Sequence, residues 1–147
     1  MYKNILLPTD GSTLSQKAVL HGIKLAQAVG ARVTGFFASP PATPVIYKGI
    51  FPVGLTTPEE HARAIERMVE QHHDFIRKAA QKAGVQSKCV HVTSDFPAEA
   101  ILSAAKKEKC DLIVMASRSR RGLSGILLGS QTQKVLAHST VPVLIQR

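Results

Sequence analysis

The residues best suited to chemistry lie in a basic, glycine-containing stretch from Met115 to Ser130. The apolar run Asp111–Ala116 leads into it and predicts a buried strand, and a helical segment, Gln131–Ser139, leads out of it. Between them, two small residues stand in a row of basic ones, and three glycines follow. A helix start presents unpaired N–H groups and the positive end of the helix dipole, so this stretch predicts a phosphate-binding site.

A plain glycine-rich connection is the alternative interpretation of this stretch, because such connections occur throughout α/β proteins. Ser130 to Gln133 fits a capping box with Ser130 as the N-cap, and Gly129 permits a close backbone approach or a positive φ. The chain has neither G-x-x-x-x-G-K-[ST] nor G-x-G-x-x-G, which excludes a Walker loop and a dinucleotide fingerprint. The local pattern leaves both interpretations open.

The composition is typical of one globular domain spanning residues 1–147. Hydrophobic residues make up 44% and charged residues 20% of the chain. The net charge of +9 favours anionic partners such as nucleotides. That charge is spread along the chain, there is no Trp, and aromatic residues make up only 5%, which disfavours nucleic-acid binding.

The cysteines and the first residues of the sequence indicate in which cellular compartment the protein is expected. Cys89 and Cys110 form no C-x-x-C pair, and residues 1–4 run directly into an apolar strand without a signal peptide. No apolar run approaches the roughly 20 residues of a membrane span. We therefore expect a cytoplasmic protein with reduced thiols and no membrane partner.

Apolar strands alternate with amphipathic helices, which predicts an α/β fold with a parallel sheet between two helical layers. Five residues mark the expected strands, one in each: Leu6, Val33, Val90, Ile113 and Val143. The expected strand ranges are Lys3–Pro8, Arg32–Ala38, Val85–Thr93, Asp111–Ala116 and Val141–Ile145.

The expected helices lie between these strands and carry start and stop signals. Capping boxes are expected at Thr13–Gln16 and Thr57–Glu60, and Gly30 is expected to end the first helix. In the last helix, Val135 and Leu136 are expected to face inward. The proline-rich connection Ser39–Thr56 could be a lid, part of a subunit interface or disordered.

Ligands of parallel sheets bind beyond the carboxyl ends of the strands, where the strand order reverses. Two turns compete for that place: Pro8-Thr9-Asp10 after the first strand, and the stretch from Met115 onward after the fourth. If those two strands are neighbours, both turns frame one cleft.

The histidines and the strand cysteine do not predict a metal site. His72 lies on the apolar stripe of its helix and is interpreted as a packed side chain with its polar tip at the surface. His73 faces another direction, so the two histidines lack the i, i+4 spacing of a helical metal site. Cys89 and His91 share one face of their strand, but two ligands alone do not make a zinc site.

Four segments carry a resemblance to the universal stress protein family that extends over nearly the whole chain. They are Ile5–Ser12, Asp111–Met115, Arg121–Ser130 and Val141–Ile145. The resemblance implies a three-layer α/β sandwich of the Rossmann-like, adenine nucleotide alpha hydrolase-like type, with strand order 3-2-1-4-5. It also implies a cytoplasmic stress-response role and a homodimer paired through the last strand, with Val141, Val143, Leu144 and Ile145 at the interface.

One branch of this family binds ATP through G-x-x-G-x9-G-[ST], and another branch lacks the motif and does not bind ATP. Here Gly129-Ser130 keeps the end of the motif, while Ala116 and Ser119 replace its first two glycines. The resemblance places Asp10 by the ribose and Ala38 by the adenine. The full nucleotide-binding set that it implies is Pro8, Thr9, Asp10, Ala38, Met115, Ala116, Ser117, Arg118, Ser119, Gly129, Ser130, Gln131 and Thr132.

Three functions compete. The favoured one is a regulatory module that binds an adenine nucleotide, ATP, alone or with magnesium. The alternative is a dimeric stress-response interaction protein that does not bind ATP. An enzyme is disfavoured, because no Ser-His-Asp or Cys-His set stands at a suggestive spacing and the glycine stretch has no lysine in the P-loop position.

Overall fold

The structure is a computed structural model that describes residues 1–41, 47–48, 51–52, 57–117 and 128–147. Its helices are α1 (Thr13–Val29), α2 (Pro58–Lys82), α3 (Pro97–Lys107) and α4 (Ser130–His138). Its strands are β1 (Asn4–Pro8), β2 (Arg32–Ser39), β3 (Tyr47–Lys48), β4 (Phe51–Pro52), β5 (Ser87–Thr93), β6 (Leu112–Ala116) and β7 (Val143–Gln146).

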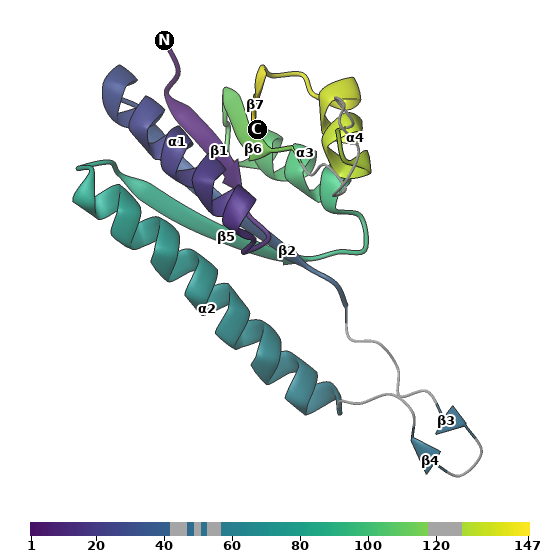
Figure 1. Cartoon of the computed structure of the whole chain (residues 1–147). Helices are drawn as coiled ribbons and strands as arrows, with labels where there is room; N and C mark the ends of the chain where they lie inside the picture. Colours follow the sequence, from purple (N-terminus) through teal and green to yellow (C-terminus); the bar gives the residue numbers. More distant parts are fainter. Residues whose placement is uncertain (42–46, 49–50, 53–56, 118–127) are drawn as a thin grey trace.

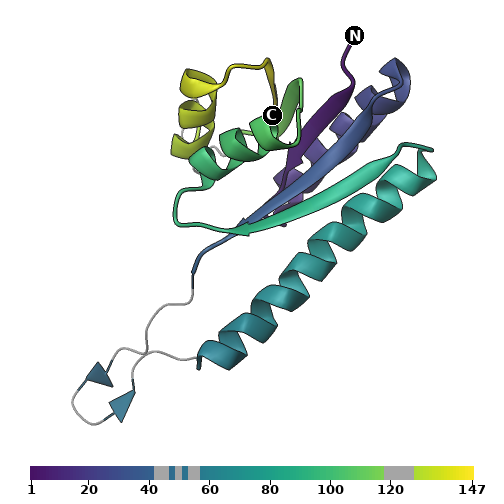
Figure 2. The same ribbon diagram turned by 180° about the vertical axis from the view of Figure 1, so that it is seen from behind.

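Five strands form one parallel sheet in the order β5-β2-β1-β6-β7. Helices α1 and α2 cover one face, and α3 and α4 cover the other (Figures 1 and 2). Counted among themselves, these strands have the order 3-2-1-4-5, so the predicted fold class is confirmed. Each of the five marker residues lies in a strand, and β1 is interior. The short β3 and β4 form a separate antiparallel pair.

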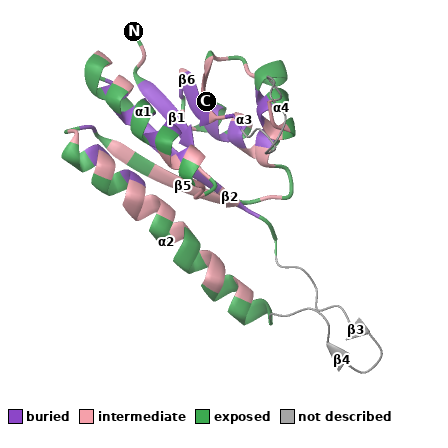
Figure 3. Ribbon diagram, in the orientation of Figure 1, coloured by how far each residue is buried: buried purple, intermediate pink, exposed green. Residues whose placement is uncertain are grey.

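Burial on both faces explains the continuous apolar strands. All five residues of β1 are buried, and alternate side chains enter different cores. Ile5 and Leu7 pack with α1 and α2, whereas Leu6 packs with α3 and α4. Figure 3 shows the buried residues gathered on the central strands, while the first turns of α2 are exposed or half-buried.

The side chain of Asp111 fixes the start of the central strand pair. Its two carboxylate oxygens accept hydrogen bonds from the backbone N–H groups of Lys3 and Asn4, at 2.8 and 3.0 Å. Its own N–H donates to the carbonyl of Asn4 at 3.0 Å. One residue therefore ties the beginning of β1 to the beginning of β6.

The helix boundaries follow most of the predicted signals. The capping box at Thr57 is present, and Gly30 ends α1 with a left-handed φ of 72°. The capping box predicted at Thr13 is wrong: Ser12 is the N-cap and accepts from Ser15 N, because the helix already begins at Thr13. Leu136 is 39% exposed, so its predicted inward position is also wrong, whereas Val135 is buried.

Gly35 lets α2 approach the sheet closely. A Cβ at this position would lie 2.6 Å from Cδ1 of Ile76 and 3.3 Å from Sγ of Cys89. Ile76 is completely buried, so it has little room to move away.

We expect Gly35→Ala to lower the free energy of unfolding by about 1–3 kcal/mol, the usual range for overpacking a core. Urea denaturation measures this change. Ile76→Val removes the offending Cδ1, so the double variant should lose less than the sum of the two single variants. Additive losses would show that the contact between Gly35 and Ile76 is not the cause.

Candidate functional site

The strand order reverses between β1 and β6, and the candidate site lies at their carboxyl ends. The register places Ile5 opposite Leu112 and Leu6 opposite Ile113. Continued along both strands, this register brings Pro8 level with Met115. On the other side of β1, Pro8 pairs with Phe36 of β2, two residues before Ala38. The two predicted turns therefore do belong to neighbouring strands.

The turn between β1 and α1 is held by its own hydrogen bonds. Thr9 N–H donates to the carbonyl of Phe36 at 2.9 Å, and the hydroxyl groups of Thr9 and Ser15 lie 3.1 Å apart. Gly11 N–H donates to Oγ1 of Thr9, and Ser12 N–H donates to Oδ1 of Asp10 at 2.9 Å. The exposed side chain of Asp10 therefore lies on a turn whose conformation is fixed by hydrogen bonds.

Helix α4 begins beside the end of β6. Oγ1 of Thr132 donates to the carbonyl of Ala116 at 3.3 Å, and Thr132 is 3% exposed. This hydrogen bond fixes the first turn of α4 against the last residue of β6. The first N–H groups of an α-helix have no partner inside the helix, and they point outward from its start.

The predicted capping box at Ser130 is wrong. Gly129 is the N-cap, with no side-chain cap, and Ser130 is already the first helical residue. Gln133 turns its side-chain amide to the carbonyl of Leu128, at 2.8 Å, rather than back to the N-cap. Gly129 has a φ of −58°, so it does not use the positive φ that glycine permits.

Two further predicted site residues have partners in the fold. Oε1 of Gln131 accepts from Ala98 N–H at 3.2 Å, which caps the start of α3. Ser117 is 8% exposed, and its N–H donates to the carbonyl of Gln146 in β7 at 3.0 Å. Within the described part of the Met115–Ser130 stretch and the helix after it, the N–H groups at the start of α4 are the ones best placed to bind an anion.

Of the remaining predicted site residues, two pack against the core and two fall outside the described part of the chain. Met115 is 7% exposed and packs in the α3 and α4 core, and Ala38 is half-buried against the same core. Arg118 and Ser119 lie outside the described residues. The structure thus brings the Pro8–Asp10 turn, Ala38, the end of β6 and the start of α4 to one edge of the sheet.

Sequence reasoning missed the contact of His72 with this edge. The imidazole ring of His72, on α2, lies against Gly11, where a Cβ would collide with it. Its Nε2 atom is buried and has no hydrogen-bond partner among the described residues, so the expectation of a surface-exposed polar tip is wrong. No local signal could reveal this contact, because 61 residues separate His72 from Gly11.

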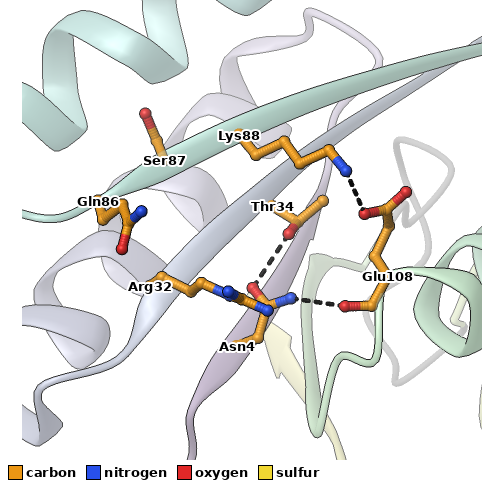
Figure 4. A pocket seen from close by; sticks show the side chains of 7 residues that line it. All are labelled: Asn4, Arg32, Thr34, Gln86, Ser87, Lys88 and Glu108. Carbon is orange, nitrogen blue, oxygen red and sulfur yellow. Dashed lines mark hydrogen bonds and ion pairs between the residues drawn. The ribbon is translucent and has the colours of Figure 1, made fainter.

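A hollow of about 170 Å³ lies at the opposite, amino-terminal end of the strands (Figure 4). Its floor is closed by its own hydrogen bonds: Thr34 donates to Asn4 at 3.0 Å, and Asn4 donates to the carbonyl of Glu108 at 2.9 Å. Lys88 pairs with the carboxylate of Glu108 at 2.6 Å. These partners satisfy the buried polar groups, so the hollow is a structural junction separate from the candidate site.

Strand β7 forms an edge of the sheet and pairs with β6 alone among the described strands. The carbonyl of Pro142 accepts from Ile113 of β6, and that of Gln146 accepts from Ser117 just after β6, so the backbone groups of Val143 and Ile145 point the other way. Val141 precedes the strand, which begins at Val143 rather than at Val141 as expected. Its side chain packs against the α3 and α4 core.

Two searches of the described part of the chain gave negative results. None of its helices is long and apolar enough to cross a lipid bilayer. Within the same residues, no group of three or more His, Cys, Asp or Glu side chains is placed to hold a metal ion.

The model of the universal stress protein family matches residues 1–147. The chain belongs to the universal stress protein family. A universal stress protein of Thermus aquaticus is 37% identical over 147 residues, which cover all of both chains. A universal stress protein of Methanocaldococcus jannaschii is 32% identical over 99% of this chain and 82% of the relative.

Solved structures of universal stress proteins share the fold of this family member. The Methanocaldococcus jannaschii protein MJ0577 superposes with a TM-score of 0.76 and 25% identity, covering 99% of this chain and 95% of its own. A universal stress protein solved in complex with cAMP gives a TM-score of 0.70 at 24% identity, covering 99% and 98%. One from Archaeoglobus fulgidus, in complex with dAMP, gives 0.67 at 18% identity, covering 99% and 98%.

Burial lowers the pKa of three histidines in this universal stress protein, namely His72, His73 and His91. In the unfolded chain a histidine titrates near pH 6.5. Between the lowered folded values and pH 6.5, the unfolded state binds more protons than the folded state. The free energy of unfolding therefore rises with pH in this window.

We expect the protein to lose stability as the pH falls from 7.5 through 6.5 to 5.5. Urea denaturation at each pH measures this loss. His91→Gln should reduce the slope more than the matched change His21→Gln, at an exposed position of α1. Equal stability of the wild-type protein at pH 7.5 and 5.5 would contradict the expectation.

Proposed function

We propose that this protein is a cytoplasmic stress-response regulatory module that binds an adenine nucleotide, ATP, at the carboxyl edge of β1 and β6. The observation that carries the proposal is the hydrogen bond from Thr132 to Ala116, which fixes the start of α4 at the end of β6. The β1–α1 turn with Asp10 stands on the neighbouring strand. A helix start and a carboxylate on adjacent strands suit the phosphates and the ribose of one ligand.

In this proposal the phosphates meet the N–H groups of Gly129, Ser130 and Gln131, and Asp10 accepts hydrogen bonds from the ribose hydroxyls. Ala38 lies where the resemblance puts the adenine, and its small side chain leaves space for a ring. Arg118 and Ser119 complete the proposed set, and magnesium would accompany the phosphates. Structural neighbours in complex with cAMP and dAMP give precedent for adenine nucleotides on this fold.

The helix dipole alone cannot give useful affinity. A phosphate at an exposed helix start gains about 0.3–1 kcal/mol, whereas micromolar binding needs about 8 kcal/mol. The remainder must come from burial of the adenine and from hydrogen bonds to backbone groups. The test should therefore address a single backbone N–H.

Ser130 offers such a test because it is the first residue of α4. Proline is well tolerated at this position, and Gly129 already has the extended backbone (φ −58°, ψ 153°) that a following proline requires. Ser130→Pro therefore removes one phosphate-facing N–H without breaking the helix. Ser130→Ala is the matched control, because it removes the hydroxyl and keeps the N–H.

We expect calorimetry to give ATP binding by the wild-type protein. Ser130→Pro should weaken it by about tenfold or more, as for the loss of a hydrogen bond to a charged group. Ser130→Ala should change it less. Absence of heat with millimolar ATP would overturn the proposal. If Ser130→Pro binds ATP as tightly as the wild-type protein, the start of α4 does not bind the phosphates.

A dimeric interaction protein that does not bind ATP is the second candidate. It is favoured by Ala116 in place of the first glycine of the ATP motif and by the use of the Gln131 side chain to cap α3. Both candidates share a homodimer formed through β7, including Val143, Leu144 and Ile145. An isologous contact would pair the outward backbone groups of two edge strands at once.

We expect Val143→Lys to convert the dimer to a monomer, because it puts like charges together at the two-fold contact. Light scattering at micromolar concentration measures the mass, and thermal melting checks that the variant is folded, since Val143 also packs against the core. Thr140→Lys makes the same charge change at an exposed residue just before the strand and should stay dimeric. A monomeric wild-type protein, or a dimeric Val143→Lys, would contradict pairing through β7.

A further inference from the structure

His72 joins helix α2 to the turn that carries Asp10. Its ring fills the space where a side chain at position 11 would lie, and it meets Phe37 edge-on, with ring centroids 4.5 Å apart. Gly11 has a φ of 79°, in the region that favours glycine. Both the ring and the backbone conformation therefore demand glycine at this position, and the ring limits where the turn can move.

The ring of His72 is itself held from several sides. Phe37 is 4% exposed, and it also stacks on His91 with centroids 5.6 Å apart. Nε2 of His91 lies 2.7 Å from Oγ of Ser39 at the end of β2. A connected set of rings on α2, β2 and β5 thus braces the turn.

This bracing comes from the face of the sheet opposite to the proposed adenine position. Side chains alternate along β2, so Phe37 meets α2, whereas Ala38 packs on the α3 and α4 side. His72 does not reach the proposed ligand position and can act only through the turn.

We propose that His72 is a positioning residue of the nucleotide site, whose ring holds Gly11 and so sets where the Asp10 carboxylate stands. This inference rests on the proposed function, because it concerns the residue that would bind the ribose. The α2 helix thereby becomes part of the site without contacting the ligand.

The charge of His72 should matter as well as its shape. Burial lowers the pKa of His72, and the negative charge of Asp10 partly opposes this effect, so the ring is neutral at pH 7. On β2 the ring faces uncharged Phe37, with His91 of β5 beyond it, and His73 is its neighbour on α2. Protonation at lower pH places a positive charge near Asp10, where it competes with the ribose hydroxyls for the carboxylate.

Calorimetry of the full chain with ATP at pH 7.5 tests the role of the ring. His72→Ala should weaken binding by about tenfold, the equivalent of about 1.4 kcal/mol. His72→Phe keeps an aromatic ring against Gly11 and Phe37 and should stay within about threefold of wild type. His21→Ala, at an exposed position of α1, is the matched control and should bind as wild type.

A titration from pH 7.5 to 5.5 separates positioning from simple packing. Wild type should lose more ATP affinity than His72→Phe as the pH falls, because only wild type has a group at position 72 that can take up a proton beside Asp10. The titration of ATP itself is common to both proteins and cancels in the comparison. Parallel pH profiles for wild type and His72→Phe would overturn the electrostatic part of the proposal.

The outcomes distinguish this inference from the proposed function. If wild type and His72→Ala bind ATP equally, the positioning role is overturned and the proposed function stands. If wild type binds no ATP, both fall. A double-mutant cycle on unfolding tests the contact without a ligand: Gly11→Ala should cost less in the His72→Ala background, and additive costs would overturn the contact.

Discussion

The hydrogen-bonded pairing of β1 with β6 is the constraint on which the candidate site depends. These strands are more than 100 residues apart in the chain, and the Asp111 side chain ties their beginnings together through Lys3 and Asn4. Once this register is set, the carboxyl ends of both strands reach the same edge of the sheet. The Asp10 turn follows one of these strands, and the start of α4 lies beside the end of the other.

Several polar groups around this edge form hydrogen bonds within the fold. Thr9, Ser12 and Ser15 satisfy the turn, and Gln131 caps α3. A buried polar group without a partner is costly, so these hydrogen bonds stabilise the described part of the edge without any ligand. Groups that are already held in place lose little conformational entropy when a ligand binds.

Helix α2 contributes to the same edge from the other side of the sheet. Gly35 admits Ile76 close to β2, and Gly11 admits His72 close to the turn. These two glycines, on β2 and in the β1–α1 turn, thus allow α2 to pack close to the sheet and to the turn. Both contacts come from the same helix, so the position of α2 is linked to the turn next to Asp10 as well as to β2.

The sequence by itself determined the fold class, the five strands and the family, because strand burial on both faces imposes continuous apolar runs and the motif segments are long. It also located the Pro8–Asp10 turn at the end of β1 and residues Met115 and Ala116 at the end of β6. The predicted starts of two helices were wrong by one residue. Ser12 rather than Thr13 and Gly129 rather than Ser130 are the N-caps, since adjacent small residues compete for one capping position. The tertiary structure alone decided that His72 rests on Gly11 and that Gln131 caps α3. Such contacts depend on packing between distant segments, which local periodicity does not encode.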